Sequence, residues 1–124
     1  MPVILKIDSH RKVVYSTFYG KLTDEELLRH GARIASDPDF RKDFSEIVDF
    51  TDVTQASISK DTLTTMANTR SLFSQSVFHI VVAAGGALFD LASRYKELSR
   101  KSRPNLFVVH TRAEAYKLLA KRKE

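Results

Sequence analysis

The stretch VFHIVVA (Val77–Ala83) decides the fold, because it is the most β-rich window of the chain and is apolar on both faces. A strand of this kind is typical of a parallel sheet that is covered by helices on both sides. We therefore predict a strand here at the centre of a sheet. Its polar residue, His79, is interpreted as a hydrogen-bonded core imidazole in preference to a metal ligand.

Toward the N-terminus, two strand-like runs lie on either side of a turn-like segment and predict a hairpin. These runs are Val3–Ile7 and VVYSTFYG (Val13–Gly20), and Gly20 is expected to end the second strand. A T-x-x-E capping motif that begins at Thr23 then predicts a helix from Asp24 to about Ser36. The hairpin is thus followed directly by a helix.

Between that helix and the central strand, EIVDF (Glu46–Phe50) predicts a short strand and Ser59 predicts the cap of a second helix. Beyond the central strand, a third helix is expected from Gly85-Gly86 to the segment before Pro104. LFVVH (Leu106–His110) is then the last strand. A second T-x-x-E motif begins the closing helix, whose buried side is expected to contain Tyr116, Leu119 and Ala120.

The predicted order of elements is ββαβαβαβα. Strands that alternate with helices indicate right-handed crossovers and parallel pairing. We therefore predict the α/β class, with a single mixed, mostly parallel sheet of about five strands, an N-terminal hairpin, and helices packed against the sheet. The 124 residues and 43% hydrophobic content fit one domain over residues 1–124.

Composition excludes several classes of function and indicates a compartment. The chain has no cysteine, its N-terminus does not resemble a signal peptide, and its longest apolar stretch (Val77–Phe89) is interrupted by His79 and a glycine pair. We therefore expect a cytoplasmic protein with no transmembrane segment. Residues 91–124 carry a net charge of +7, which could attract nucleic acid, anionic lipid or an acidic protein. We favour the alternative that these charges form a solvated surface on two helices, so nucleic-acid binding is not expected.

Several segments resemble one known superfamily over nearly the whole chain. They are YGKLTDEELL (19–28), DPDFRKDFSEIVDFTDVT (37–54), FHIVVA (78–83), RYKEL (94–98) and LFVVHTRAEAYKLL (106–119). The chain is similar to the STAS superfamily, the sulfate-transporter and anti-sigma-factor-antagonist fold, and more closely to small stand-alone bacterial members described as STAS/CRAL-TRIO-like. The resemblance implies a regulatory protein-interaction module.

In the antagonist branch of that superfamily, a kinase phosphorylates a hydroxyl at the start of a helix. The family spacing, counted from Asp49, places Ser57 at the motif's aspartate, Ile58 at the phosphoacceptor, Ser59 next and Lys60 at the glycine. Isoleucine at the acceptor position argues against the usual phosphorylation switch, although Ser57 or Ser59 could still be modified. The alternative that we favour is that Ser59 simply caps the helix.

Candidate ligand-binding residues follow from the edge at which open α/β sheets bind ligands, the carboxyl ends of their strands. Asp52, Gly85, Gly86 and His110 are expected at this edge. They include no nucleophile elbow, phosphate-binding loop or metal-ligand spacing, so we expect no enzyme, no cofactor and no metal site. If several members of a set of aromatic residues lined one pocket, the resemblance to CRAL-TRIO lipid carriers would suggest an apolar ligand. The set is Phe40, Phe44, Phe73, Phe89 and Tyr95.

Two functions therefore remain open. The first is a non-catalytic STAS-like interaction module that contacts a protein partner through a regulatory loop containing Asp52, Ser57, Ser59 and Lys60, and through the helix after it. The alternative is a carrier or sensor for a small lipid-like or anionic ligand, bound near Gly85, Gly86 and His110 or between helices. A small sheet with an edge hairpin is also compatible with a homodimer.

Overall fold

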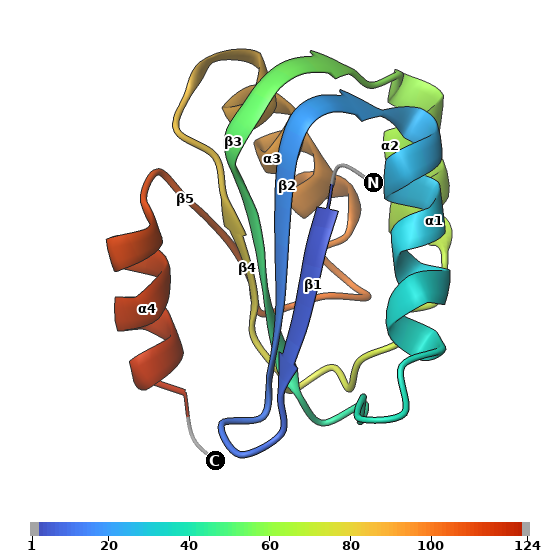
Figure 1. Ribbon diagram of the computed structural model, residues 1–124. Coiled ribbons are helices and arrows are strands. Elements are labelled where there is room, and N and C mark those ends of the chain that lie inside the picture. Colours follow the sequence, from blue (N-terminus) through green and yellow to red (C-terminus); the bar gives the residue numbers. More distant parts are fainter. Residues whose placement is uncertain (1–2, 123–124) are drawn as a thin grey trace.

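The computed structural model describes residues 3–122, which form an α/β fold around one five-stranded sheet (Figure 1). The strands are β1 (Val3–Asp8), β2 (Val13–Thr23), β3 (Ser45–Ser57), β4 (His79–Val82) and β5 (Leu106–Val109). β1 pairs antiparallel with β2, and all other pairs are parallel. These findings confirm the predicted class, hairpin and element order. The strand order β1-β2-β3-β4-β5 corrects one point, since it places β3, and not the strand of Val77–Ala83, in the middle of the sheet.

Four helices cover the two faces of the sheet. They are α1 (Asp24–Ala35), α2 (Lys60–Asn68), α3 (Gly86–Leu98) and α4 (Arg112–Ala120). The first three cover one face, whereas α4 covers the other (Figure 1). Because consecutive strands are neighbours and the handedness of each crossover is fixed, α1, α2 and α3 must share a face. α4 follows the last strand and is free of this constraint.

The helix starts agree with the capping residues predicted from sequence. Thr23 accepts a hydrogen bond from the amide of Glu26 at 3.4 Å, and Ser59 accepts one from the amide of Thr62 at 3.2 Å. At α4, Thr111 and Glu114 form both halves of a capping box. The side-chain oxygens thereby satisfy amides that lack a partner in the first turn of a helix.

The strands β2 and β3 extend beyond their predicted ends. Gly20 does not end β2, because its left-handed backbone (φ +68°) lies at an irregularity of the pairing that the strand passes through. Pairing then continues as far as Thr23 and Ser57. The segment from Thr51 to Ser57, predicted as part of a loop, therefore belongs to β3.

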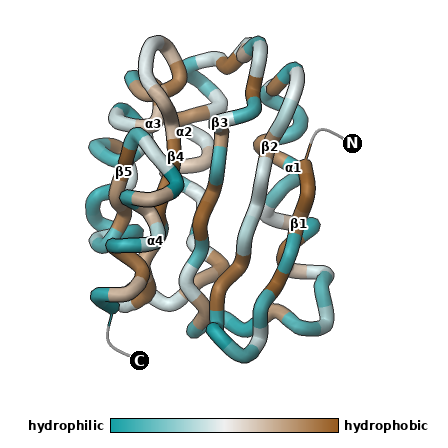
Figure 2. Tube along the Cα trace, turned by 60° about the vertical axis from the view of Figure 1, so that its left-hand side comes forward, coloured by the Kyte–Doolittle hydropathy of each residue, from teal (hydrophilic) through white to brown (hydrophobic). Residues whose placement is uncertain are grey.

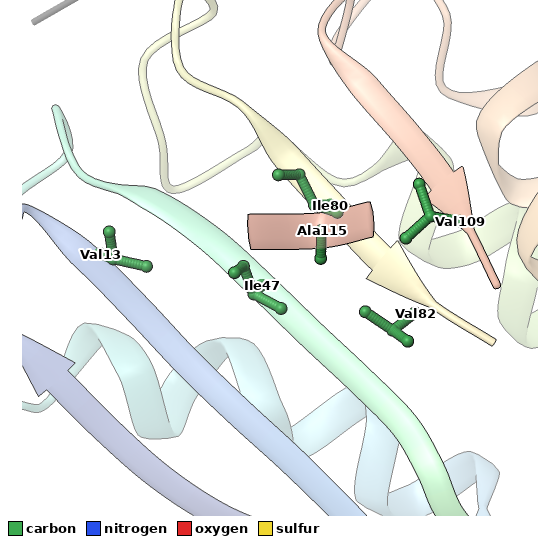
Figure 3. Close-up of a cluster of buried hydrophobic side chains, with 6 residues drawn as sticks. All are labelled: Val13, Ile47, Ile80, Val82, Val109 and Ala115. Carbon is green, nitrogen blue, oxygen red and sulfur yellow. The ribbon is translucent and has the colours of Figure 1, made fainter. Parts of the chain in front are cut away.

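Side chains on the α4 side of the sheet form one cluster of buried hydrophobic residues (Figure 3). Its buried members are Val13, Ile47, Ile80, Val82, Val109 and Ala115. The predicted buried side of this helix is wrong in two places, since Tyr116 is 53% exposed and Ala120 is also exposed. The helix instead presents Ala115, with the partly buried Leu118 and Leu119, at the spacing of a single helix face.

The other face of the sheet packs beneath α1, α2 and α3. Hydrophobic and hydrophilic residues alternate near the hairpin end of β1 (Figure 2), as expected of a strand whose successive side chains point to opposite faces of the sheet. Within residues 3–122, none of the helices is long and apolar enough to cross a membrane. The three-helix side is where polar side chains gather in the interior.

Candidate functional site

A cavity of about 220 Å³ lies between the sheet and the three helices α1, α2 and α3. Its wall is mostly apolar and contains four aromatic side chains: Phe18, Phe50, Phe73 and Tyr95. Phe18 packs against Phe50 with ring centroids 5.3 Å apart. Such a wall excludes water and suits an apolar or aromatic molecule.

Two polar residues on adjacent strands form part of this wall. Glu46 on β3 and His79 on β4 are paired in register, and Glu46 Oε1 lies 2.9 Å from His79 Nδ1. Both side chains face the cavity because their neighbours Ile47 and Ile80 face α4. His79 is 2% exposed, and its Nε2 has no hydrogen-bond partner among the described residues. The predicted hydrogen-bonded core imidazole is thus confirmed for one of its two ring nitrogens.

His30 contributes a second imidazole from α1. Its ring meets Phe18 edge-on at a centroid distance of 5.0 Å, and both ring nitrogens are buried without a hydrogen-bond partner in the part of the chain that the structure describes. Burial lowers the pKa of His30, against an opposing effect of the Glu46 charge. The side chain is therefore held in its neutral form, with one donor and one acceptor.

A hydroxyl on the same face adds to these atoms. Ser16 on β2 is buried, and its Oγ has no hydrogen-bond partner within residues 3–122. Native proteins pair the large majority of their buried polar atoms, so this hydroxyl is an exception, as are the nitrogens of His30 and His79. The three polar residues described above that line the cavity, His30, Glu46 and His79, are called the cavity cluster.

Basic residues lie where the cavity opens. Arg70 and Leu72 are both exposed and line it, so they mark its mouth. Arg103 also lines the cavity; its guanidinium lies 5.5 Å from the centroid of the Tyr95 ring and donates to the Thr69 carbonyl at 3.3 Å. Burial raises the pKa of the Tyr95 hydroxyl. The cavity thus has a positive mouth and an interior that contains a carboxyl group.

The geometry of the cavity cluster does not suit a metal ion. No group of three or more histidine, aspartate or glutamate side chains within residues 3–122 could hold one. What the cluster offers is hydrogen-bonding capacity next to an apolar wall.

The ligand-binding edge predicted from sequence lies outside this cavity. We call Asp49, Asp52, Arg112, His110 and the glycine pair the carboxyl edge. The His110 ring stacks on Phe89, with centroids 4.3 Å apart and planes 6° apart, and its Nδ1 lies 3.3 Å from the Ala84 carbonyl. Gly85 and Gly86 begin α3, and the φ of +64° at Gly86 is one that glycine adopts without strain.

Arg112 joins the two aspartates of the carboxyl edge. Its guanidinium forms ion pairs with Asp49 and, at 2.9 Å, with Asp52. Asp49 is 6% exposed and also accepts from the amide and hydroxyl of Thr51. Although burial acts to raise the pKa of Asp49, the hydrogen bonds from Arg112 and Thr51 outweigh it and hold the pKa below its ordinary value. Both aspartates of this edge are therefore paired with Arg112.

Of the predicted regulatory residues, Asp52 belongs to the carboxyl edge, whereas Ser57, Ser59 and Lys60 lie neither there nor at the cavity. Ser57 ends β3 in register with Thr23, and Ser59 caps α2 while its amide donates to Asp24 at 2.9 Å. Lys60 is the exposed first residue of α2. The capping role that sequence favoured for Ser59 is confirmed, whereas modification of either serine stays a prediction.

Sequence reasoning missed the cavity cluster. His79 stood out as a polar residue in an apolar strand, but its contact with Glu46 depends on the register of two parallel strands that are far apart in sequence. Of the aromatic pocket candidates, Phe73 and Tyr95 do line the cavity, while Phe89 stacks on His110.

No match was found for this chain among protein families, curated proteins or solved structures. The structure shows an α/β fold with a mixed sheet, and the comparisons assign the chain to no family.

Proposed function

We propose that this protein is a STAS-like carrier or sensor that binds a small, mainly apolar molecule in the cavity, with one hydrogen-bonding group of the ligand at the cavity cluster. The observation that carries this proposal is the set of buried nitrogen atoms on His30 and His79 that lack a partner among the described residues. A ligand with a matching polar group would supply what these nitrogens lack.

The size and wall of the cavity support the same function. A cavity of about 150 Å³ with apolar walls can hold benzene. The 220 Å³ found here therefore has room for one substituted ring or a short chain. Apolar walls with a few convergent polar groups are the usual make-up of small-molecule sites.

The interaction-module function stays a prediction, as do the cytoplasmic location, the bacterial STAS relationship, the homodimer and the absence of enzyme activity. Part of the surface expected to contact a protein partner pairs with β2 as strand β3. The exposed start of α2 is still available for such a contact. We rank ligand binding first because it accounts for the buried polar atoms and the interaction module does not.

Native mass spectrometry of protein purified from its own host tests the proposal, together with thermal shifts across a panel of apolar and aromatic compounds. We expect a small-molecule adduct, or a rise in melting temperature with at least one compound. Gly31→Leu places a larger side chain in the wall of the cavity and should abolish the shift. Ala113→Leu makes a comparable change on the exposed side of α4 and should not. A clean mass with no shift for any compound would refute ligand binding.

A further inference from the structure

The hydrogen bond between Glu46 and His79 defines what a ligand must supply. An ionised carboxylate only accepts hydrogen bonds, so the His79 Nδ1 that contacts Glu46 at 2.9 Å carries the shared hydrogen. In a neutral imidazole the other nitrogen, Nε2, is then an acceptor. This atom is buried and lacks a donor among residues 3–122, and it belongs to a side chain that lines the cavity. The ligand should therefore bring an O–H or N–H group.

Charge narrows the choice of donor. A ligand carboxylate at this position would lie next to the Glu46 carboxyl group and be repelled. An ammonium group would have to pass Arg70 and Arg103, which line the cavity, and lose its hydration in an apolar space. A neutral hydroxyl avoids both costs.

The walls indicate what carries this hydroxyl. Phe18, Phe50 and Phe73 line the cavity, and Phe73 lies edge-on to the His79 ring at a centroid distance of 5.2 Å. Aromatic rings prefer such edge-to-face and offset contacts with one another. A flat aromatic ring would fit this surface and place a ring hydroxyl beside the imidazole.

We propose that the ligand is a neutral hydroxyaromatic compound whose hydroxyl donates a hydrogen bond to His79 Nε2. Glu46 keeps the hydrogen of the neutral imidazole on Nδ1, which leaves Nε2 as an acceptor. Other groups beside the site are His30, Tyr95 and Arg103, while Arg33 acts on His30 from the same helix. The inference rests on the proposed function, since it identifies the ligand class of the same cavity.

The first test compares three probes, 4-nitrophenol, nitrobenzene and benzoate, by calorimetry or fluorescence. We expect 4-nitrophenol to bind at least tenfold more tightly than nitrobenzene, the extent of a missing hydrogen bond of about 1.4 kcal/mol. Benzoate should bind more weakly than 4-nitrophenol. Equal binding of nitrobenzene, or preferential binding of benzoate, would overturn the hydroxyl inference and leave the ligand cavity standing. No binding of any probe would overturn the inference, and the adduct and panel experiment above decides the proposed function separately.

The second test identifies the accepting atom by mutation. His79→Phe should lower affinity for 4-nitrophenol by about tenfold or more and leave nitrobenzene binding unchanged. The matched control, His110→Phe, replaces a histidine outside the cavity and should change neither quantity. An unchanged affinity of His79→Phe for 4-nitrophenol would overturn the inference. If this variant does not fold, Glu46→Leu decides the question. It removes the acceptor that keeps the hydrogen on Nδ1, so it should weaken binding of 4-nitrophenol and not that of nitrobenzene, and an unchanged affinity for 4-nitrophenol would overturn the inference.

Discussion

The carboxyl edge and the cavity cluster are two groups of polar side chains on one sheet, and they differ in how their hydrogen bonds are satisfied. At the carboxyl edge, Asp49 and Asp52 share Arg112, and His110 stacks on Phe89. In the cavity cluster, His30 and His79 keep buried nitrogens with no partner in the described chain. Position at a strand end led to the prediction of a ligand site at Asp52, His110 and the glycine pair of the first group, whereas unmet hydrogen bonds are the basis on which we propose the second.

The difference follows from what each group does for the fold. Arg112 is the first residue of α4, and its bonds to β3 join segments about sixty residues apart in sequence. The carboxyl edge thereby fastens the fourth helix to the sheet. In the cavity cluster, the hydrogen bond between Glu46 and His79 joins β3 to β4, but the buried nitrogens of His30 and His79 that lack partners among the described residues cost free energy. Such a cost is a reason to look for a function at the residues that cause it.

The largest loss of stability should come from Arg112→Ala. It leaves the Asp49 carboxylate buried with Thr51 as its remaining hydrogen-bond donor. We expect the free energy of unfolding at neutral pH to fall by about 2 kcal/mol, less than for a fully buried pair because Arg112 is partly exposed. Urea denaturation measures this loss.

The pH dependence of that loss identifies its cause. The folded-state pKa of Asp49 lies below its ordinary value of about 3.9, so the stabilisation is complete above about pH 4 and is lost as the pH falls through the folded pKa. The difference between Arg112→Ala and wild type should therefore shrink in acid. A difference that stays constant down to acid pH would show that packing, and not the ion pair, is responsible.

The pH dependence of stability tests whether His30 is buried in its neutral form. Because burial lowers its pKa, the unfolded chain binds a proton at pH values where folded His30 does not. Stability should accordingly fall as the pH drops below about 6.5, by up to about 1.4 kcal/mol per pH unit, until the folded pKa is reached. His30→Phe keeps an aromatic ring beside Phe18 and should remove this slope. His110→Phe is the control and should retain it; equal slopes in wild type and His30→Phe would contradict the burial of a neutral imidazole.

The fold could be predicted from local signals that act over short distances. T-x-x-E motifs at Thr23 and Thr111 mark helix starts, and the apolar window around Ile80 marks a strand covered on both faces. The extent of β2 and β3 could not be predicted. Glycine often ends a strand, but Gly20 lies at an irregularity of the pairing within β2, and the strand continues beyond it. The predicted helix face at Tyr116 was displaced by one residue for a related reason: only the packing partner shows which side is buried.

The cavity cluster could not be predicted from the sequence because its members are far apart in the chain. Glu46 and His79 were each placed on a strand, yet a shift of one residue in register would turn either side chain to the α4 face. His30 belongs to a helix whose distance from the sheet depends on all its neighbours. Spacing rules search for residues close in sequence, and none of these three pairs is close.

Removing one partner of a buried ion pair usually destabilises a protein, but replacing both partners with apolar residues often does not. Glu46→Leu combined with His79→Phe removes both polar partners and keeps side chains of similar size. We expect the free energy of unfolding to stay unchanged or to rise by about 1 kcal/mol, since a satisfied pair with an unmet nitrogen is replaced by apolar contacts. The same variant should lose binding of the 4-nitrophenol probe. A loss of stability as large as that of Arg112→Ala would assign the cavity cluster a structural role and remove the contrast between the two groups.

The smallest effect should come from the outer half of the carboxyl edge. Asp52 shares Arg112 with Asp49, but its side chain is 55% exposed whereas that of Asp49 is 8% exposed. Water can replace what Arg112 gives to Asp52, so Asp52→Asn should cost less than about 0.5 kcal/mol in urea denaturation. Glu25→Gln, which removes an exposed ion pair with Arg29 on α1, is the matched control and should behave alike. A cost near that of Arg112→Ala would mean that the two aspartates act as one unit, and that the stability of the edge depends on the charge of the whole network and not on the burial of Asp49.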